Sequence, residues 1–205
     1  KDQTVRLWEA ASGRELRILK GHEAPVVSVQ LAADGATLLT ASSDRTARLW
    51  EMSSGRELQV LRGHEAPVIS AEFSADGKRV LTASWDATAR LWDATSGGAL
   101  HVLRGHEEAL RSARFSPDGR TVLTASLDET ARLWGVASGR ELQVLRGHGL
   151  SKYSHFVGKT RPQHASLEVG KGEVQVWRDT KAVFKASLQD LHQVWDSVSW
   201  KICQQ

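Results

Sequence analysis

The chain has 205 residues, a formal net charge of +3 and 40% hydrophobic residues, which is long enough for one domain with a substantial core. Its single cysteine, Cys203, excludes an intrachain disulfide framework and a cysteine-based zinc cluster. No apolar stretch approaches the roughly 18 residues of a transmembrane helix. We therefore expect a cytoplasmic protein without membrane attachment.

The first residues correspond to the second half of a repeat. Residues 4–8 and 15–19 read as two strands, and they precede a Gly-His dipeptide that recurs every 42 residues. An Asp and a Trp keep the same step. The four copies of the dipeptide are Gly21-His22, Gly63-His64, Gly105-His106 and Gly147-His148.

Each period contains four strand-length runs. In the period after Gly63 they span residues 68–73, 79–84, 88–92 and 100–103, and the turn dipeptides Asp76-Gly77 and Ser96-Gly97 separate them. No run in residues 1–149 has a helical period. The pattern predicts an all-β array with four strands in each unit.

The order Gly-His, about two dozen residues, then Asp-x-Thr-x-x-Leu-Trp resembles the WD40 repeat of β-propellers. The resemblance covers residues 1–149 and implies four-stranded antiparallel blades around a channel. It implies a half blade over residues 1–20 and blades over about 26–62, 68–104 and 110–146. Because most rings of this family have seven blades, the chain resembles a fragment of a larger, bacterial-type WD40 protein, with an incomplete ring. Its open blade edges are expected to associate.

The resemblance also implies a buried hydrogen-bonded set in each blade, which we call a tetrad. Each tetrad joins the Gly-His histidine, a threonine of the second strand, the aspartate of the next loop and the tryptophan of the third strand. The three sets are His22, Thr40, Asp44, Trp50; His64, Thr82, Asp86, Trp92; and His106, Thr124, Asp128, Trp134.

A histidine, an aspartate and a nearby threonine also suggest a nucleophile with its base. Three copies at one spacing favour architecture, because a catalytic site seldom needs triplicate. No familiar metal-ligand or nucleophile motif occurs in the chain. We expect no enzyme activity, no metal and no cofactor.

The composition changes after Gly149. Residues 150–205 hold eight of the 27 basic and five of the 24 acidic residues, so this segment carries the whole net charge. Trp177 falls 43 residues after Trp134, which indicates a diverged fifth blade, with Leu191-His192 opening a sixth. Unrelated sequence is the other interpretation. Interleaved Lys and Trp also suggest nucleic-acid binding, but strand cores and solvated lysines produce the same pattern more often.

The repeats differ mainly in the loops of one predicted rim. There we expect a protein-binding apolar patch of Pro67, Ile69, Trp85 and Leu127, edged by Arg111, with Val27 and Ser43 at the equivalent positions of the first blade. We call these seven residues the rim patch.

A second surface hypothesis concerns three arginines in one register of the third strands, Arg48, Arg90 and Arg132. They suggest an anion site, but a solvated edge of ion pairs is the more ordinary outcome. The function predicted overall is a non-catalytic scaffold or recognition module for proteins or peptides. The alternative is a regulatory or sensor part of a multidomain kinase or nucleotide-binding signalling protein.

Overall fold

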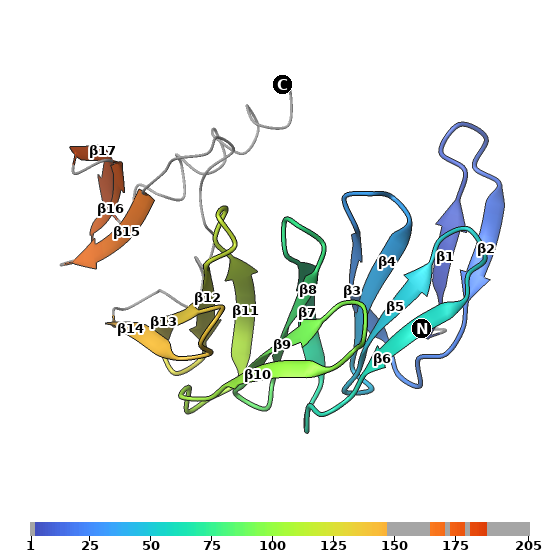
Figure 1. Ribbon diagram of the computed structural model, residues 1–205, viewed down its shortest axis with the longest axis horizontal. Coiled ribbons are helices and arrows are strands. Elements are labelled where there is room, and N and C mark those ends of the chain that lie inside the picture. Colours follow the sequence, from blue (N-terminus) through green and yellow to red (C-terminus); the bar gives the residue numbers. More distant parts are fainter. Residues whose placement is uncertain (1–2, 147–164, 171–172, 179–180, 188–205) are drawn as a thin grey trace.

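The computed structural model describes residues 3–146 and the backbone of residues 165–170, 173–178 and 181–187 (Figure 1). Strands and turns make up residues 3–146, and no helix occurs among them. Within the described residues, therefore, no helix is long and apolar enough to cross a membrane. The all-β prediction is confirmed.

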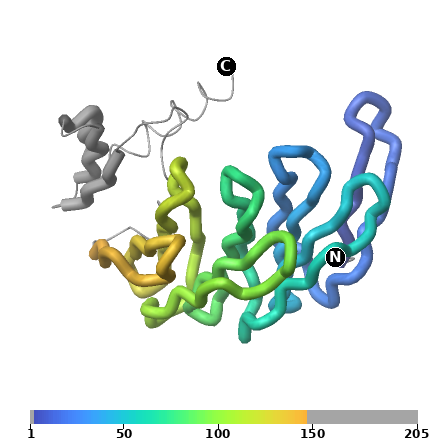
Figure 2. The backbone as a smooth tube through the Cα atoms, in the orientation of Figure 1, coloured from blue at the N-terminus to red at the C-terminus, as the bar shows by residue number. Residues whose placement is uncertain are grey.

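Three four-stranded antiparallel sheets follow one another as blades, after a two-stranded sheet of β1 (Val5–Trp8) and β2 (Glu15–Leu19). Figure 2 shows them as successive turns of the backbone along an open arc, which is the form expected of an incomplete propeller. The strands of the blades are β3 (Val26–Leu31), β4 (Thr37–Ser42), β5 (Ala47–Glu51), β6 (Glu57–Leu61); β7 (Val68–Phe73), β8 (Arg79–Ser84), β9 (Ala89–Asp93), β10 (Ala99–Leu103); and β11 (Leu110–Phe115), β12 (Thr121–Ser126), β13 (Thr130–Gly135), β14 (Glu141–Arg146).

The hairpin between β7 and β8 shows how the sequence sets a turn. Gly77 has φ 69°, in the left-handed region, and its N–H donates to the Ser74 carbonyl at 2.8 Å. The Ser74 hydroxyl donates to Asp76 at 2.6 Å. Glycine is favoured there because it lacks the Cβ that disfavours positive φ. The Asp-Gly signal therefore marked the hairpin correctly.

Several strand boundaries differ from their predictions by one residue: the strands predicted over 4–8, 88–92 and 100–103 span Val5–Trp8, Ala89–Asp93 and Ala99–Leu103. The run beginning at Thr88 enters the ladder only at Ala89. Thr88 instead donates its backbone N–H and its hydroxyl to Asp86, at 2.9 and 2.6 Å, so it belongs to the turn.

The core lies between blades. One face of the first blade packs Leu39, Leu49 and Leu61 against Phe73 and Trp92 of the second. The next core repeats this contact between the second and third blades. Because no blade buries its apolar faces alone, each depends on its neighbours for the burial of whole side chains.

The segment 165–187 contains a three-stranded antiparallel sheet of β15 (Ala165–Gly170), β16 (Glu173–Arg178) and β17 (Lys181–Ser187). Trp177 lies on β16, in register with Ser166. The assignment of residues 150–205 to a diverged blade or to unrelated sequence stays a prediction. Leu191-His192 lies outside the described residues.

The face of the first blade toward β1 and β2 is incompletely covered. Val29 and Leu31 of β3 are 53% and 49% exposed, whereas their equivalents in the second blade, Ala71 and Phe73, are only 5% and 9% exposed. Residues 5–19 supply a two-stranded sheet, so no inner strands among the described residues cover β3. This leaves an open apolar face.

We predict that the chain self-associates through this open face. The double substitution Val29→Ser and Leu31→Ser should weaken association at least tenfold, because burying each aliphatic side chain stabilises by roughly 1.5–3 kcal/mol and about 1.4 kcal/mol corresponds to tenfold. Light scattering after size-exclusion chromatography measures the effect. A wild-type chain that is a monodisperse monomer with a sharp cooperative melt contradicts the prediction.

Candidate protein-binding site

The structure brings the four side chains of each tetrad together. In the first blade, His22 Nδ1 lies 2.7 Å from Asp44 Oδ2 and Nε2 lies 2.7 Å from Thr40 Oγ1. The Trp50 indole N–H donates to Thr40 Oγ1 at 2.9 Å. With a neutral imidazole, protons are donated in one direction, from indole to hydroxyl to imidazole to carboxylate. The same chain of contacts recurs in the other two tetrads.

The tetrad aspartate also joins two loops. Asp86 Oδ2 accepts the backbone N–H of Glu65 at 3.0 Å, and Oδ1 accepts the Thr88 backbone N–H and hydroxyl. This ties the loop between β6 and β7 to the loop between β8 and β9. Sequence reasoning left the threonine out of the set, although the Asp-x-Thr spacing could have shown it. The equivalent threonines are Thr46 and Thr130.

Burial and hydrogen bonding shift the pKa values in opposite ways. Burial lowers the pKa of His22 and of His106, and this outweighs the neighbouring aspartates, which raise it. Burial alone would raise the pKa of Asp44, but hydrogen bonds from Thr46 and His22 outweigh it and lower the pKa to about 2. The pKa values of Asp86 and Asp128 are lowered by the same kind of hydrogen bonds. The first and third tetrads therefore favour neutral imidazole beside carboxylate.

The threonine hydroxyls of the tetrads are buried, so the tetrads stabilise the fold and cannot contact a substrate. The three threonines, Thr40, Thr82 and Thr124, are 0% exposed. A hydroxyl that no substrate can contact does not act as a nucleophile. Among the described residues, no group of three or more His, Cys, Asp and Glu side chains could hold a metal ion.

In the rim loops, the tetrads hold strained residues between their hydrogen bonds. Arg45, Ala87 and Glu129, each directly after a tetrad aspartate, have φ of 70°, 64° and 61°. A left-handed conformation costs a residue with Cβ roughly 1–2 kcal/mol. It persists here because the aspartate is bonded on both sides, so the loop shape is set before any partner arrives.

Within each blade, the structure places the variable rim residues side by side. The Trp85 backbone N–H donates to the Pro67 carbonyl at 3.0 Å, and Ser43 donates to Pro25 in the same way. Leu127 donates to Ala109 at 2.9 Å. The loops after the fourth and second strands therefore share one rim, at the end of the blades opposite the β3–β4, β7–β8 and β11–β12 hairpins (Figure 1).

The rim patch is unevenly exposed. Trp85 is 59% exposed, so its own blade leaves more than half of the residue uncovered, and Val27 and Leu127 are 50% and 41% exposed. Ile69 packs partly against the core between the second and third blades. Arg111 is exposed, whereas Ser43 and Pro67 are half-buried. The patch spans three blades whose first strands, β3, β7 and β11, are neighbours.

The arginines of the third strands differ from the solvated edge expected of them. Arg48 is only 6% exposed and pairs with Glu57 at 2.6 Å, and Arg132 pairs with Glu141 at 2.5 Å. Arg90 has no such pair among the described residues, but its guanidinium carbon lies 5.9 Å from the Trp92 ring centroid. The edge is therefore salt-paired in the first and third blades and not in the second.

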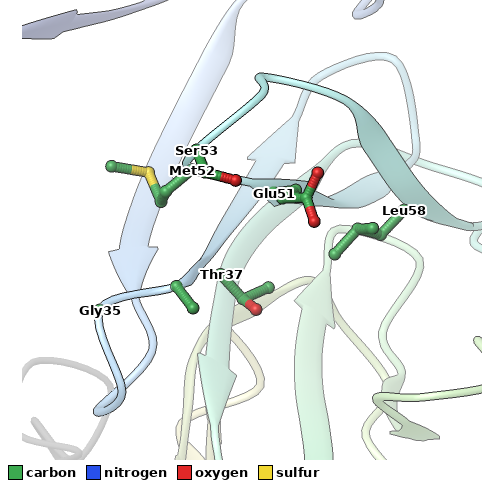
Figure 3. A pocket seen from close by; sticks show the side chains of 7 residues that line it. Gly35, Thr37, Glu51, Met52, Ser53 and Leu58 are labelled. Atoms are coloured by element: carbon green, nitrogen blue, oxygen red, sulfur yellow. The ribbon is translucent and has the colours of Figure 1, made fainter.

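A pocket of about 410 Å³ lies at the end of the first blade that is opposite the rim (Figure 3). Glu51 is its single ionisable side chain and already accepts a hydrogen bond from the Ser54 hydroxyl. Its other polar side chains are the hydroxyls of Thr37 and Ser53, so a cluster of charged groups is not among its lining residues. The lining residues are Gly35, Ala36, Thr37, Glu51, Met52, Ser53 and Leu58.

We predict that His64→Ala destabilises the fold by about 2–4 kcal/mol, because it removes the acceptor of the buried Thr82 hydroxyl and one of the donors to the Asp86 carboxylate. Urea unfolding followed by tryptophan fluorescence gives the free energy. His101→Ala is the matched control, since His101 makes one solvent-side bond to the Ala137 carbonyl, and it should cost under about 1 kcal/mol. Equal losses in both variants would contradict a special role for the tetrad.

The pKa directions predict acid sensitivity in two stages. Since the pKa of His22 and of His106 is lowered on folding, the unfolded chain binds more protons below its own histidine pKa of about 6.5. The free energy of unfolding should therefore decrease as the pH is lowered through this range, by up to about 1.4 kcal/mol per pH unit for each histidine. The lowered pKa of Asp44 adds a second loss below about pH 4, which is complete near pH 2.

Urea titrations at pH 7.5, 5.5 and 4.0 measure the first stage. The double variant His22→Gln and His106→Gln should be less stable but should lose less stability between pH 7.5 and 5.5. A pH dependence identical to that of the wild-type chain would refute the assignment to these histidines.

Comparison with known proteins bears on the whole array. The family described as WD domain, G-beta repeat, matches residues 13–51, 55–93 and 97–135, which together make up more than half of the chain. A search of curated proteins returned no match. With the repeats, the four-stranded sheets and the tetrads, these matches show that the chain belongs to the WD40 repeat family.

Proposed function

We propose that the chain is a non-catalytic interaction module that binds a protein or peptide segment on its rim patch. The observation that carries this proposal is Trp85, which is 59% exposed and directly precedes the hydrogen-bonded tetrad residue Asp86. Tryptophan and arginine are over-represented among residues that dominate binding energies. An exposed indole on a preorganised loop loses little conformational entropy on binding.

The family supports the general class of function. WD40 repeats generally mediate protein–protein interactions, and WD40 domains are typically non-catalytic scaffolds. The internal comparison supports the location. Residues 55–64 recur letter for letter at 139–148, whereas Ser43, Trp85 and Leu127 differ at one equivalent position. Loop residues that vary between otherwise repeated sequences are the ones that can be specific for one partner. We propose that this binding takes place in the cytoplasm.

We predict that Trp85→Ala weakens binding at least tenfold, which corresponds to about 1.4 kcal/mol, without lowering the melting temperature. The probe is a peptide selected from a displayed random library on the full chain, and fluorescence anisotropy gives its Kd. Trp8→Ala is the matched control, because Trp8 is a similarly exposed tryptophan, at 55%, away from the rim. It should leave the Kd within about twofold.

His64→Ala separates binding from folding in the same assay. It is expected to lower the melting temperature first and to lose binding only where the fold is lost. If Trp85→Ala keeps both the fold and the wild-type Kd, the binding site lies elsewhere.

A further inference from the structure

A glutamate pairs with the third-strand arginine in most of the repeats. The two residues lie nine positions apart on neighbouring strands, and the guanidinium Nη1 contacts the carboxylate Oε2 at 2.5–2.8 Å. Such charge-assisted contacts are the strong class of hydrogen bond. The three pairs are Arg6–Glu15, Arg48–Glu57 and Arg132–Glu141.

The second blade keeps the arginine and lacks the glutamate. Its arginine is Arg90, and the residue nine positions later is Ala99, opposite Trp92 in the β9–β10 ladder. No carboxylate within residues 3–146 forms an ion pair or a hydrogen bond with Arg90. The buried Nε has no acceptor in Arg48, Arg90 and Arg132 alike, so the difference between the blades is the carboxylate at Nη1. A guanidinium stays charged at any physiological pH. Arg90 therefore has a positive charge that the described chain does not neutralise.

The other components of the pair remain in place. A Cβ added to Gly21 would meet Arg48 Nη1 at 2.6 Å, Trp50 at 3.0 Å and Glu57 Oε2 at 3.2 Å. At Gly105 the equivalent arginine, tryptophan and glutamate lie at 2.7, 3.2 and 3.1 Å.

The corresponding point at Gly63 meets Arg90 Nη1 and the Trp92 ring, with no carboxylate oxygen beside them. The guanidinium and the indole thus lie beside Gly63, as their equivalents lie beside Gly21 and Gly105, although the guanidinium is closer and the indole, at 3.6 Å, is further away. Ala99 supplies no carboxylate at the position where the other blades have glutamate, so Arg90 keeps its capacity for a charge-assisted contact.

Arg90 adjoins the rim patch along the chain. Gly63 opens the loop that ends at Pro67, and Arg90 lies five residues after Trp85, at the start of β9. The nearby Asp86 carboxylate is already occupied by His64, Thr88 and the backbone of Glu65. A segment bound over Trp85 would therefore find one unneutralised cation at the edge of its site.

We propose that the bound partner places an acidic side chain against Arg90, where Glu57 and Glu141 lie in the neighbouring blades. The proposal rests on the proposed function, and it names the chemistry of the partner: an aspartate or glutamate at one fixed position beside the residue that covers Trp85. The partner's side chain makes the N–H···O⁻ contacts that the glutamates of β6 and β14 make in the neighbouring blades.

The first experiment tests whether a carboxylate binds beside Arg90 without a partner. Sodium acetate is titrated into the full chain against sodium chloride of equal ionic strength, and the arginine Nε–H signals are followed by NMR. The Arg90 signal should shift saturably while the Arg48 signal does not. Acetamide should cause no shift. An Arg90 signal that moves no more than that of Arg48 overturns the proposal.

Ala99→Glu supplies the missing carboxylate from the chain itself. It should abolish the acetate response of Arg90 and raise the melting temperature, because it restores the pair of the other blades. Leu100→Glu is the matched control, since it adds the same charge at the adjacent residue, which is 45% exposed. It should leave the acetate response intact. An unchanged acetate response in Ala99→Glu contradicts the proposal.

The second experiment uses peptides selected on the wild-type chain from the displayed library. We expect one acidic position, whose change to the amide weakens binding about tenfold on the wild type and has no further effect on Ala99→Glu. Peptides that require Trp85 but ignore Ala99→Glu overturn this inference and leave the proposed function standing. If no peptide is selected, the proposed function and the acidic partner both fail, even where Arg90 binds acetate.

Discussion

The buried carboxylate of each tetrad is the group on which the rest of the blade depends. Asp86 receives hydrogen bonds from His64, from Thr88 and from the backbone of Glu65, and so it connects loops that are about twenty residues apart. Two of its partners, His64 and Thr88, are buried, and an unmet hydrogen bond there would cost the full desolvation penalty. The same geometry in three blades makes one frame, copied along the array.

The residues that stabilise each blade are different from the residues that we propose for binding. The tetrads set the path of the rim loops and hold Arg45, Ala87 and Glu129 in left-handed conformations, whatever side chain these positions carry. The neighbouring positions are then free to vary without endangering the fold. Trp85 and the unneutralised Arg90 lie on such a frame, within one blade, so an apolar contact and an ionic contact are available to one bound segment.

Much of the scaffold could be predicted because its signals are local. The Asp76-Gly77 turn and the alternating runs placed the strands of the second blade within about one residue, and the 42-residue step aligned the members of every tetrad. Thr88 was missed as a member because its strand propensity hid its role in the turn. The sequence shows that Ala99 replaces the glutamate of the other blades. Only the structure shows that Arg90 nevertheless lies beside Gly63 and Trp92, without a carboxylate.

The sequence by itself determined the repeat, the four-stranded unit and the polar groups that must meet inside each blade, because spacing and turn chemistry act over a few residues. Tertiary structure decided which apolar and charged groups are left uncovered. The exposures of Trp85, Val29 and Leu31 depend on neighbouring loops and blades. The position of Arg90 beside Gly63 and the Trp92 ring likewise comes from folding. Burial is a property of what packs alongside, and those neighbours come from distant parts of the chain.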